Sequence, residues 1–227
     1  MAASIGTYGE RALHAALKRL IEPDESLHER PYHGCVVDVL RPDGVFEVQT
    51  RAFDRLRGKL GRLLPDTAVT VVYPAVRQKW LVWVDPDTGE TTKRRRSPKT
   101  GTPLAVCYEL YKLRPLLPDP NLTFWVVPAD VEEYRSLTGW SRDRKRGSTR
   151  LERLPVAFGE PLVLCTAADY RRLLPEGLEE PFTTAALAAC GRVPPACAQR
   201  AAAVLLQLGA IERCGKRGNA YLYRRVP

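Results

Sequence analysis

The sequence predicts a mixed α/β protein of two units, an α/β domain over residues 1–165 and a smaller domain over residues 166–227. In the first part, amphipathic helices alternate with short runs rich in β-branched residues. After residue 165 the pattern changes to closely spaced helices followed by a hairpin. The length of 227 residues allows two such domains, and a content of 44% hydrophobic and 27% charged residues is typical of a folded globular protein.

The first domain begins with a helix and three short strands. Apolar residues recur at helical spacing over residues 7–22, which predicts the helix. Strands are predicted near residues 27–32, 35–40 and 45–50. The turn residues 41–44, with the sequence RPDG, predict that the last two strands pair as an antiparallel hairpin.

A second helix and further strands follow. Residues 51–64 combine an apolar stripe with a basic face, as in a surface helix, and residues 69–74 form an apolar run typical of a buried strand. The remaining pattern predicts a strand at 79–84, a turn at 85–89, a helix at 103–114, a strand at 122–128 and a strand-like stretch at 154–165. The domain therefore starts with the order helix, three strands, helix, strand.

The second domain has clear helix boundaries. Thr166 and Asp169 form a predicted capping box before a short helix, and an Ala-rich helix ends near Cys190. Pro194 and Pro195 open another helix, which Gly209 stops, and residues 210–225 read as a hairpin. Three helices followed by a hairpin form the pattern of a winged helix-turn-helix domain.

The net charge of +9 is unevenly distributed. Residues 93–99, 142–150 and 190–227 carry net charges of +5, +4 and +6, so the rest of the chain is net acidic. Segregated basic residues favour a nucleic acid partner, although such runs are often only solvated faces.

The sequence also indicates a cellular compartment. It has no apolar run of the roughly 20 residues that a membrane span needs, and its N-terminus lacks the pattern of a signal peptide. The six cysteines stand singly without the C-x-x-C spacing of a zinc site. We therefore expect a cytoplasmic protein with buried, free cysteines and no membrane partner.

Asp38, Glu47 and Gln49 form the candidate catalytic group. Alternation along residues 35–40 places Asp38 opposite Val37 and Val39, and alternation along residues 45–50 places Glu47 and Gln49 on one face. The short turn between the strands can bring the three polar side chains together. Two carboxylates on hydrophobic strands need compensation, which a divalent cation such as Mg²⁺ supplies.

At these residues the chain resembles the PD-(D/E)XK, or restriction endonuclease-like, nuclease superfamily, most nearly its Holliday junction resolvase-like branch. That pattern has a Glu on the first helix, an Asp on the second strand and E-x-K on the third, which Glu10, Asp38 and Glu47 match. The resemblance covers roughly residues 7–74 and implies an αβββαβ core. The pairing of this core with a winged helix resembles an uncharacterised bacterial family.

The resemblance implies a Mg²⁺- or Mn²⁺-dependent deoxyribonuclease, a hydrolase of phosphodiesters. Asp38, Glu47 and the Val48 carbonyl would bind the metal, and Glu10 would be a further or indirect ligand. Gln49 stands where the family has Lys, so it would orient the attacking water without adding positive charge. An active but altered site and a lost site both remain open.

Each candidate also has a structural interpretation. Glu10 lies three residues after Thr7 and can simply complete a capping box. Asp38 and Glu47 can face solvent on an ordinary hairpin. His14 lies one helical turn after Glu10 and can join the site, but a lone surface histidine is the simpler interpretation.

The predicted nucleic-acid-binding residues lie in the three basic stretches. Gln199 and Arg200 would lie near the start of the recognition helix, and Lys216 and Arg217 at the wing tip. The full set is Arg94, Arg95, Arg96, Lys99, Arg144, Lys145, Arg146, Gln199, Arg200, Lys216 and Arg217. The competing hypothesis is a catalytically inactive, nuclease-fold DNA-binding regulator or accessory factor.

Three partner questions stay open at this level. RNA is an alternative to DNA, because basic loops do not distinguish them. The resolvase-type resemblance implies a homodimer. A winged helix also serves as a protein-interaction module in other proteins.

Overall fold

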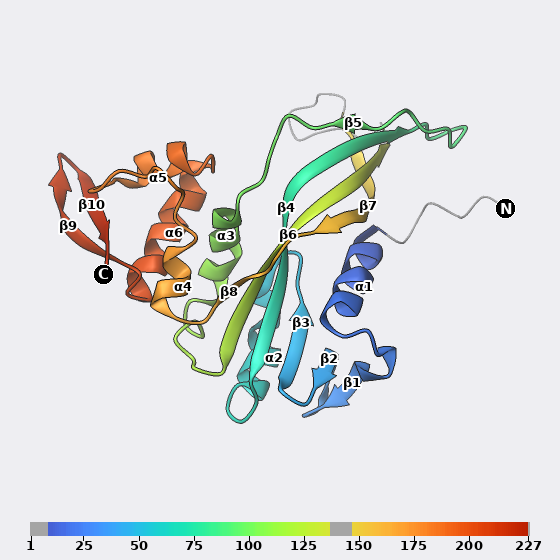
Figure 1. Ribbon diagram of the computed structural model, residues 1–227, viewed down its shortest axis with the longest axis horizontal. Helices are drawn as coiled ribbons and strands as arrows, with labels where there is room; N and C mark the ends of the chain where they lie inside the picture. The colour runs from blue at the N-terminus through green and yellow to red at the C-terminus, as the bar shows by residue number, and fades with distance from the viewer. Residues whose placement is uncertain (1–8, 137–146, 227) are drawn as a thin grey trace.

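The computed structural model describes residues 9–136 and 147–226, with side chains from residue 12 onward. In this part of the chain, most strands join one mixed sheet with the order β1-β2-β3-β4-β6-β7 (Figure 1). Strand β5 pairs with β4, and β8 pairs with β6. The strands are β1 (His28–Tyr32), β2 (Cys35–Arg41), β3 (Gly44–Val48), β4 (Val69–Val84), β5 (Arg95–Arg96), β6 (Leu122–Ser136), β7 (Thr149–Phe158) and β8 (Leu162–Leu164). The α/β class predicted from the sequence is confirmed.

The first three strands form an antiparallel meander. The turn between β2 and β3 is tight, with Arg41 opposite Gly44, as the sequence predicts. Gly44 has a φ of 138°, and a Cβ there would lie 2.4 Å from the Ala68 carbonyl oxygen, so glycine is required. After this meander the chain crosses over through a helix, and β4 runs parallel to β3.

Strands β4 and β6 are longer than predicted. The sequence suggests two separate strands at 69–74 and 79–84, but β4 is continuous over 16 residues and pairs in parallel with β6. The polar residues between the two predicted strands stay in β4 because the buried Gln78 side chain donates to the Ser97 carbonyl at 3.1 Å. The far halves of both strands extend beyond β3 and form an arm with β5 and β7.

Helices cover both faces of the sheet. Helix α1 (Gly9–Ile21) packs its buried leucines on one face, against Val39, Phe46 and Val48. Helices α2 (Arg57–Leu63) and α3 (Cys107–Leu110) pack on the other face. Short 3₁₀ turns adjoin both: Phe53–Leu56 precedes α2, and Pro103–Val106 and Tyr111–Leu113 flank α3.

The C-terminal unit contains α4 (Ala167–Arg171), α5 (Thr184–Cys190), α6 (Pro195–Gln207), β9 (Ile211–Arg217) and β10 (Ala220–Arg225). The predicted capping box of Thr166 and Asp169 is present at α4. Strands β9 and β10 form an antiparallel hairpin, and an isolated bridge joins Phe182 to Tyr223.

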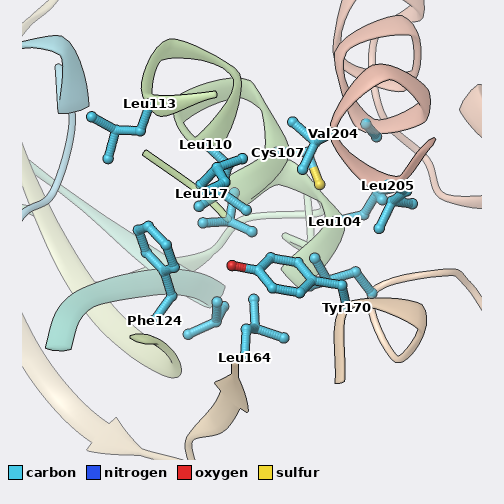
Figure 2. Packing of buried hydrophobic residues seen from close by; sticks show 14 of the residues in the cluster. Leu104, Cys107, Leu110, Leu113, Leu117, Phe124, Leu164, Tyr170, Val204 and Leu205 are labelled. Carbon is cyan, nitrogen blue, oxygen red and sulfur yellow. The ribbon is translucent and has the colours of Figure 1, made fainter. Parts of the chain in front are cut away.

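One hydrophobic cluster continues from the sheet into the C-terminal unit (Figure 2). Phe124 of β6 and Leu164 of β8 lie beside Tyr170, and Val204 and Leu205 of α6 face α3 across the same cluster. The two units therefore share buried apolar surface, and α6 is fixed against the first unit.

Two features bear on the expected compartment. Cys107 and Cys197 are buried, and Cys35 and Cys190 are half-buried, but Cys165 and Cys214 are exposed, so the expectation that the cysteines are buried is wrong for those last two. Neither thiol is drawn into the core because each lies at an end of the apolar pattern, after β8 and in the β9 hairpin. Among the described residues, no helix has the length and apolar character to cross a membrane.

Candidate active site

Asp38 and Glu47 lie side by side where β2 and β3 separate. The Asp38 carboxylate accepts a hydrogen bond from the Val48 N–H at 2.7 Å, and the Asp38 N–H donates to Glu47 Oε1 at 3.2 Å. These bonds from side chain to backbone occupy positions that the regular ladder would use. The two predicted acidic residues are therefore brought together, as the hairpin pattern indicates.

The strand alternation predicted around Asp38 is not followed. Val37 packs in the cluster under α2, whereas Val39 packs in the cluster under α1. The two valines therefore lie on opposite faces of the sheet. The change of face occurs at Asp38, opposite Glu29, whose φ is 50°. The Asp38 side chain, bonded to the Val48 N–H, takes the place of a regular ladder contact at this irregularity.

Glu47 is buried, with 4% of its surface exposed, and its partner is Lys59 of α2. Lys59 Nζ lies 2.5 Å from Glu47 Oε1. Burial, followed by the charge of Asp38, raises the pKa of Glu47 to about 7, although Lys59 acts in the opposite direction. The positive charge of Lys59 therefore does not fully offset the cost of burying an ionised Glu47 beside Asp38.

Asp38 is held by α1 through His14. His14 Nε2 lies 3.1 Å from Asp38 Oδ2. Burial opposes ionisation of Asp38, but the hydrogen bonds from His14 and Val48 outweigh burial and hold the pKa of the carboxyl below its ordinary value. The interpretation of His14 as a lone surface residue is wrong, because the turn of α1 aims it at β2.

Lys59 is not among the residues predicted from the sequence, although its spacing contains a signal. Lys59 lies three residues after Leu56 and four before Leu63, both of which are buried. It therefore stands on the core-facing stripe of the 51–64 segment rather than on its basic face. A lysine on an apolar stripe needs a buried partner, and Glu47 is that partner.

The other two predicted catalytic residues, Gln49 and Glu10, are not seen in contact with Asp38 or Glu47 among the described side chains. The Gln49 amide donates to the Arg51 carbonyl at 2.5 Å, so this side chain is directed into the loop after β3. The Gln49 N–H continues the strand pairing by donating to the Val72 carbonyl at 2.9 Å. Glu10 lies in the first turn of α1, but its side chain falls outside the described residues.

A pocket of about 850 Å³ opens beside Asp38, between α1 and the loop after β3. His14, Val48 and Gln49 line it and connect it to the carboxylate pair. The remaining lining residues include three cations and one carboxylate, Lys18, Arg51, Arg55 and Glu29. Glu29 forms an ion pair with Lys18, so the pocket as a whole favours an anion.

The described side chains contain no group of three or more His, Cys, Asp or Glu residues placed to hold a metal ion. The candidate metal site that the sequence predicts therefore consists of the carboxylate pair of Asp38 and Glu47. Mg²⁺ is usually bound by one or two carboxylates together with water and substrate phosphates. The carboxylates of Asp38 and Glu47 fit this requirement. His14 and Lys59 contact one oxygen of each carboxylate, Asp38 Oδ2 and Glu47 Oε1.

The predicted basic residues of the first run lie on the arm. Arg94 pairs with Glu132 at 2.8 Å and lies over the Trp80 ring, while Arg96 donates to Gln78 at 2.9 Å. Arg95 lies beside Arg96 in β5, and Lys99 follows. Arg144, Lys145 and Arg146 lie outside the described residues. The described basic residues of this run are therefore separate from the pocket beside Asp38.

The predicted recognition helix, α6, is partly covered. The Arg200 guanidinium lies 3.8 Å from the centre of the Tyr108 ring, and Gln207 exchanges hydrogen bonds with Arg114. Both contacts tie α6 to the α3 region. Gln199, next to Arg200 in the sequence, stays exposed. In the hairpin, Lys216 and Arg217 are exposed, and Lys216 lies over the Tyr221 ring.

Comparisons with known proteins give the following relatives. The family model of a domain of unknown function (DUF8091) matches residues 11–165. An "Uncharacterized protein" of Treponema pallidum (strain Nichols) is 30% identical over 231 aligned positions, which span 99% of this chain and 88% of that protein. No solved structure matches.

Proposed function

This chain belongs to the DUF8091 family, and for it we propose the function of a metal-dependent nuclease that hydrolyses a phosphodiester of DNA. The observation that carries the proposal is the pair of half-buried Asp38 and buried Glu47, which shares one end of the β2-β3 hairpin with Lys59 and His14. Carboxylates and a lysine in one cluster, beside a cationic pocket, are the groups that phosphodiester hydrolysis uses.

The arrangement of the first elements supports the resemblance to the PD-(D/E)XK superfamily. After α1, an antiparallel meander of β1, β2 and β3 is followed by α2 and by β4, which is parallel to β3. The αβββαβ order that the resemblance implies is thus accompanied by strand directions that bring Asp38 and Glu47 to one site.

The position of Lys59 supports an active rather than a lost site. Gln49 cannot supply the positive charge of the family's lysine. Lys59 reaches the same carboxylate group from α2, at 2.5 Å from Glu47 Oε1. The ammonium group of Lys59 offsets the negative charge of the acidic pair, which Gln49 leaves uncompensated. Lys59 acts here through Glu47 and is a positioning residue.

Asp38 and Glu47, with the Val48 carbonyl, would hold the divalent cation. When bound, Mg²⁺ would act as a Lewis acid at the phosphate and lower the pKa of the attacking water. His14 keeps Asp38 ionised and oriented by its 3.1 Å contact. Lys18 and Arg55 line the pocket on the side of α1 and the β3 loop, where they would hold phosphate oxygens.

The C-terminal unit supports DNA as the substrate. Its helices and terminal hairpin, with the Phe182 bridge to Tyr223, follow the order of a winged helix-turn-helix domain. Because α6 docks on the α3 region through Arg200, we assign its DNA contacts to Gln199 and to Lys216 and Arg217 of the hairpin. These residues would hold the duplex backbone while the first unit cuts.

Cleavage assays test the proposal. Labelled duplex, branched and single-stranded DNA, and RNA, are incubated with Mg²⁺ or Mn²⁺ and the wild type, Asp38→Asn or Glu47→Gln. We expect metal-dependent cutting that each substitution lowers by about a hundred-fold or more. Asp43→Asn is the matched control, because Asp43 is an exposed carboxylate paired with Arg41 in the nearby turn. Equal cutting by all variants would contradict the assignment.

A second candidate function is a catalytically inactive DNA-binding regulator on the same fold. The observation that favours it is Gln49, which stands at the family's lysine position and bonds to the Arg51 carbonyl. Metal binding separates the two functions, since a nuclease must bind Mg²⁺ or Mn²⁺ and a regulator need not. Binding of DNA without cutting, equal in wild type, Asp38→Asn and Glu47→Gln, would support the regulator.

A further inference from the structure

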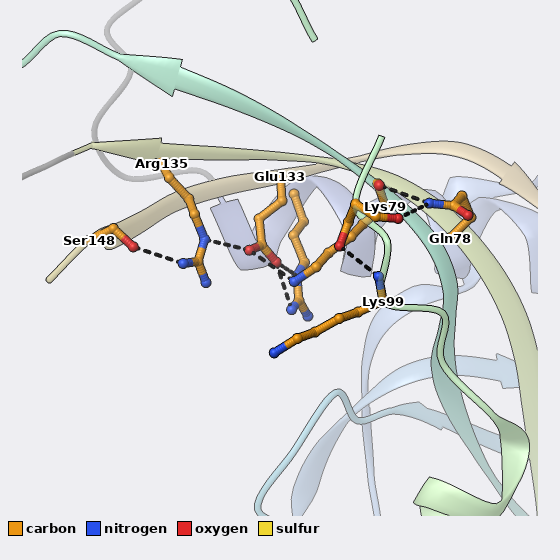
Figure 3. Close-up of polar contacts among 8 residues, drawn as sticks. Gln78, Lys79, Lys99, Glu133, Arg135 and Ser148 are labelled. Carbon is orange, nitrogen blue, oxygen red and sulfur yellow. Dashed lines mark hydrogen bonds and ion pairs between the residues drawn. The ribbon is translucent and has the colours of Figure 1, made fainter. Parts of the chain in front are cut away.

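The arm formed by β4, β6 and β7 holds a second buried carboxylate (Figure 3). Glu133 of β6 is fully buried and accepts from Arg135 Nε at 2.6 Å and from Arg153 Nε at 2.9 Å. Lys79 Nζ of β4 lies 3.5 Å from the same carboxylate. We call these four residues the Glu133 cluster.

The Glu133 cluster carries more positive charge than its carboxylate neutralises. Burial opposes ionisation of Glu133, but Arg153 and Arg135 outweigh it and lower the pKa of the carboxyl to about 2. Three cations against one carboxylate leave two positive charges in excess. The three cationic side chains keep 23%, 31% and 26% of their surface exposed, so the excess charge reaches solvent.

The three cations reach the Glu133 carboxylate from different strands. Lys79, Glu133 with Arg135, and Arg153 come from three adjacent strands, which are spaced about 4.8 Å apart in a sheet. Arg135 also donates to the Ser148 hydroxyl at 2.8 Å, which fixes its guanidinium. Lys99 extends along the same side of the cluster (Figure 3). Because it spans three adjacent strands and continues to Lys99, this positive surface is wider than a single phosphate ion and suits a chain of phosphates.

We propose that the Glu133 cluster is a binding surface for the phosphate backbone of a polynucleotide strand. Glu133 holds the three cations in fixed positions in the free protein. Binding therefore loses less side-chain conformational entropy than it would with mobile side chains. The two excess charges are then available to phosphate oxygens, which would accept from the guanidinium N–H groups that Glu133 and Ser148 do not use.

The Glu133 cluster borders a small pocket that lies next to the pocket of the candidate active site. Arg153 lines a small pocket of about 190 Å³ together with Thr50, and Thr50 also lines the larger pocket beside Asp38. A strand bound along the arm therefore leads toward the carboxylate pair. As a route to the catalytic pocket the inference rests on the proposed nuclease function, whereas binding by the cluster does not.

Binding without metal tests the inference. Fluorescence anisotropy of a labelled oligonucleotide is measured in EDTA, between about 50 and 200 mM salt, for wild type, Arg135→Gln and Arg153→Gln. We expect each substitution to weaken binding roughly five-fold and to reduce the slope of log affinity against log salt by about 0.7 to 0.9. Either variant leaves two cations on Glu133, and circular dichroism checks that it folds.

The matched control is Arg19→Gln, which removes one exposed arginine from a one-to-one pair with Glu25 and should leave the slope unchanged. Slopes that stay at the wild-type value in Arg135→Gln and Arg153→Gln, or that fall equally in Arg19→Gln, would overturn the inference. Single-stranded DNA, duplex DNA and RNA are compared, with inorganic phosphate as competitor. Displacement of the strand by an equal concentration of phosphate groups as the free ion would overturn the polymer assignment.

The outcome is separable from that of the proposed nuclease function. If the wild type cuts nothing but the two arginine variants lose salt-dependent binding, the surface stands and the nuclease assignment fails. If cutting depends on Asp38 while both arginine variants bind like the wild type, the nuclease assignment stands and the surface is overturned.

Discussion

Glu47 and Glu133 are both buried in the same sheet and paired with cations, yet their carboxyl groups ionise very differently. The pKa of Glu47 is raised to about 7, and that of Glu133 is lowered to about 2. Glu47 has one ammonium partner, Lys59, and the charge of Asp38 close by. Glu133 has three cations and belongs to the arm. Burial opposes ionisation of both carboxyl groups, and the neighbouring positive charges outweigh burial only at Glu133.

This difference separates two kinds of binding site. The Glu47 region is short of positive charge and is suited to a divalent cation. The Glu133 cluster has positive charge in excess and is suited to phosphates. Four predictions, in order of decreasing effect, test whether the two carboxylates differ as this comparison requires.

Removing the two charges should affect stability unequally. At pH 8, Glu133→Gln should lower the free energy of unfolding by about 3 to 5 kcal/mol, because it leaves three cations without their shared carboxylate. Glu47→Gln should change it by about 1 kcal/mol or less, because ionised Glu47 is itself unfavourable there. Urea unfolding followed by circular dichroism measures both values. Equal losses would remove the contrast between the sites.

The pH dependence of stability should have opposite signs at the two sites. Glu47 binds its proton more tightly in the folded chain, so its contribution is present below its ordinary pKa of 4.5 and is lost as pH rises through about 7. Glu133 binds its proton less tightly when folded, so its contribution is present above pH 4.5 and is lost as pH falls toward 2. Each effect approaches about 3 kcal/mol.

Urea unfolding of the wild type and both variants across this pH range measures the two contributions. The Glu47→Gln profile should lack the decline between pH 4.5 and 7 that the wild type shows, and the Glu133→Gln profile should lack the loss at acid pH. A Glu47→Gln profile parallel to the wild type would show that Glu47 ionises normally in the folded protein.

Divalent cations should stabilise the protein through Glu47 and not through Glu133. Mn²⁺ at about 100 times its Kd should add about 2.7 kcal/mol to the free energy of unfolding at pH 8. The gain should be smaller at pH 6, because protons compete with the metal for Glu47. Thermal unfolding with and without Mn²⁺ measures this. We expect the stabilisation by Mn²⁺ to be lost in Glu47→Gln and kept in Arg135→Gln. Stabilisation that survives in Glu47→Gln would place the metal elsewhere.

Removing a single lysine should have the smallest effect and again an unequal one. At pH 8, where Glu47 is ionised in the wild type, Lys59→Met should cost about 1 to 2 kcal/mol, limited because Glu47 then takes up a proton instead of remaining an unpaired charge. Lys79→Met should cost about 0.5 kcal/mol, because Arg135 and Arg153 still neutralise Glu133. Chemical denaturation of both variants gives the comparison, and a larger loss for Lys79→Met would reverse it.

Much of the fold could be predicted from local patterns. The helix near 7–22, the hairpin at residues 41–44 and the capping box of Thr166 each depend on neighbouring residues, and each is observed. The juxtaposition of Asp38 and Glu47 was also predictable, because a short turn fixes which residues of the two strands lie opposite. The length of β4 was not predictable, since its polar middle section is held by Ser97 from another segment.

The partners of the acidic residues were harder to predict from the sequence. His14 meets Asp38 across 24 positions of the chain, and Lys79 meets Glu133 across 54. Neither distance leaves a periodic signal in the sequence. Arg200 was predicted to face DNA from its helix position, but the docking of α6 on the α3 region places it over Tyr108.

The sequence by itself determined the α/β class, the order of the first elements, the hairpin that joins Asp38 to Glu47 and the segregation of basic charge. Short-range backbone preferences and alternation suffice for these features. Only the tertiary structure decided that Lys59 and His14 join the acidic pair, that Glu133 collects three cations and that α6 is partly covered. Those contacts follow from how helices and distant strands pack to bury their apolar faces, and such packing fixes which charges become neighbours.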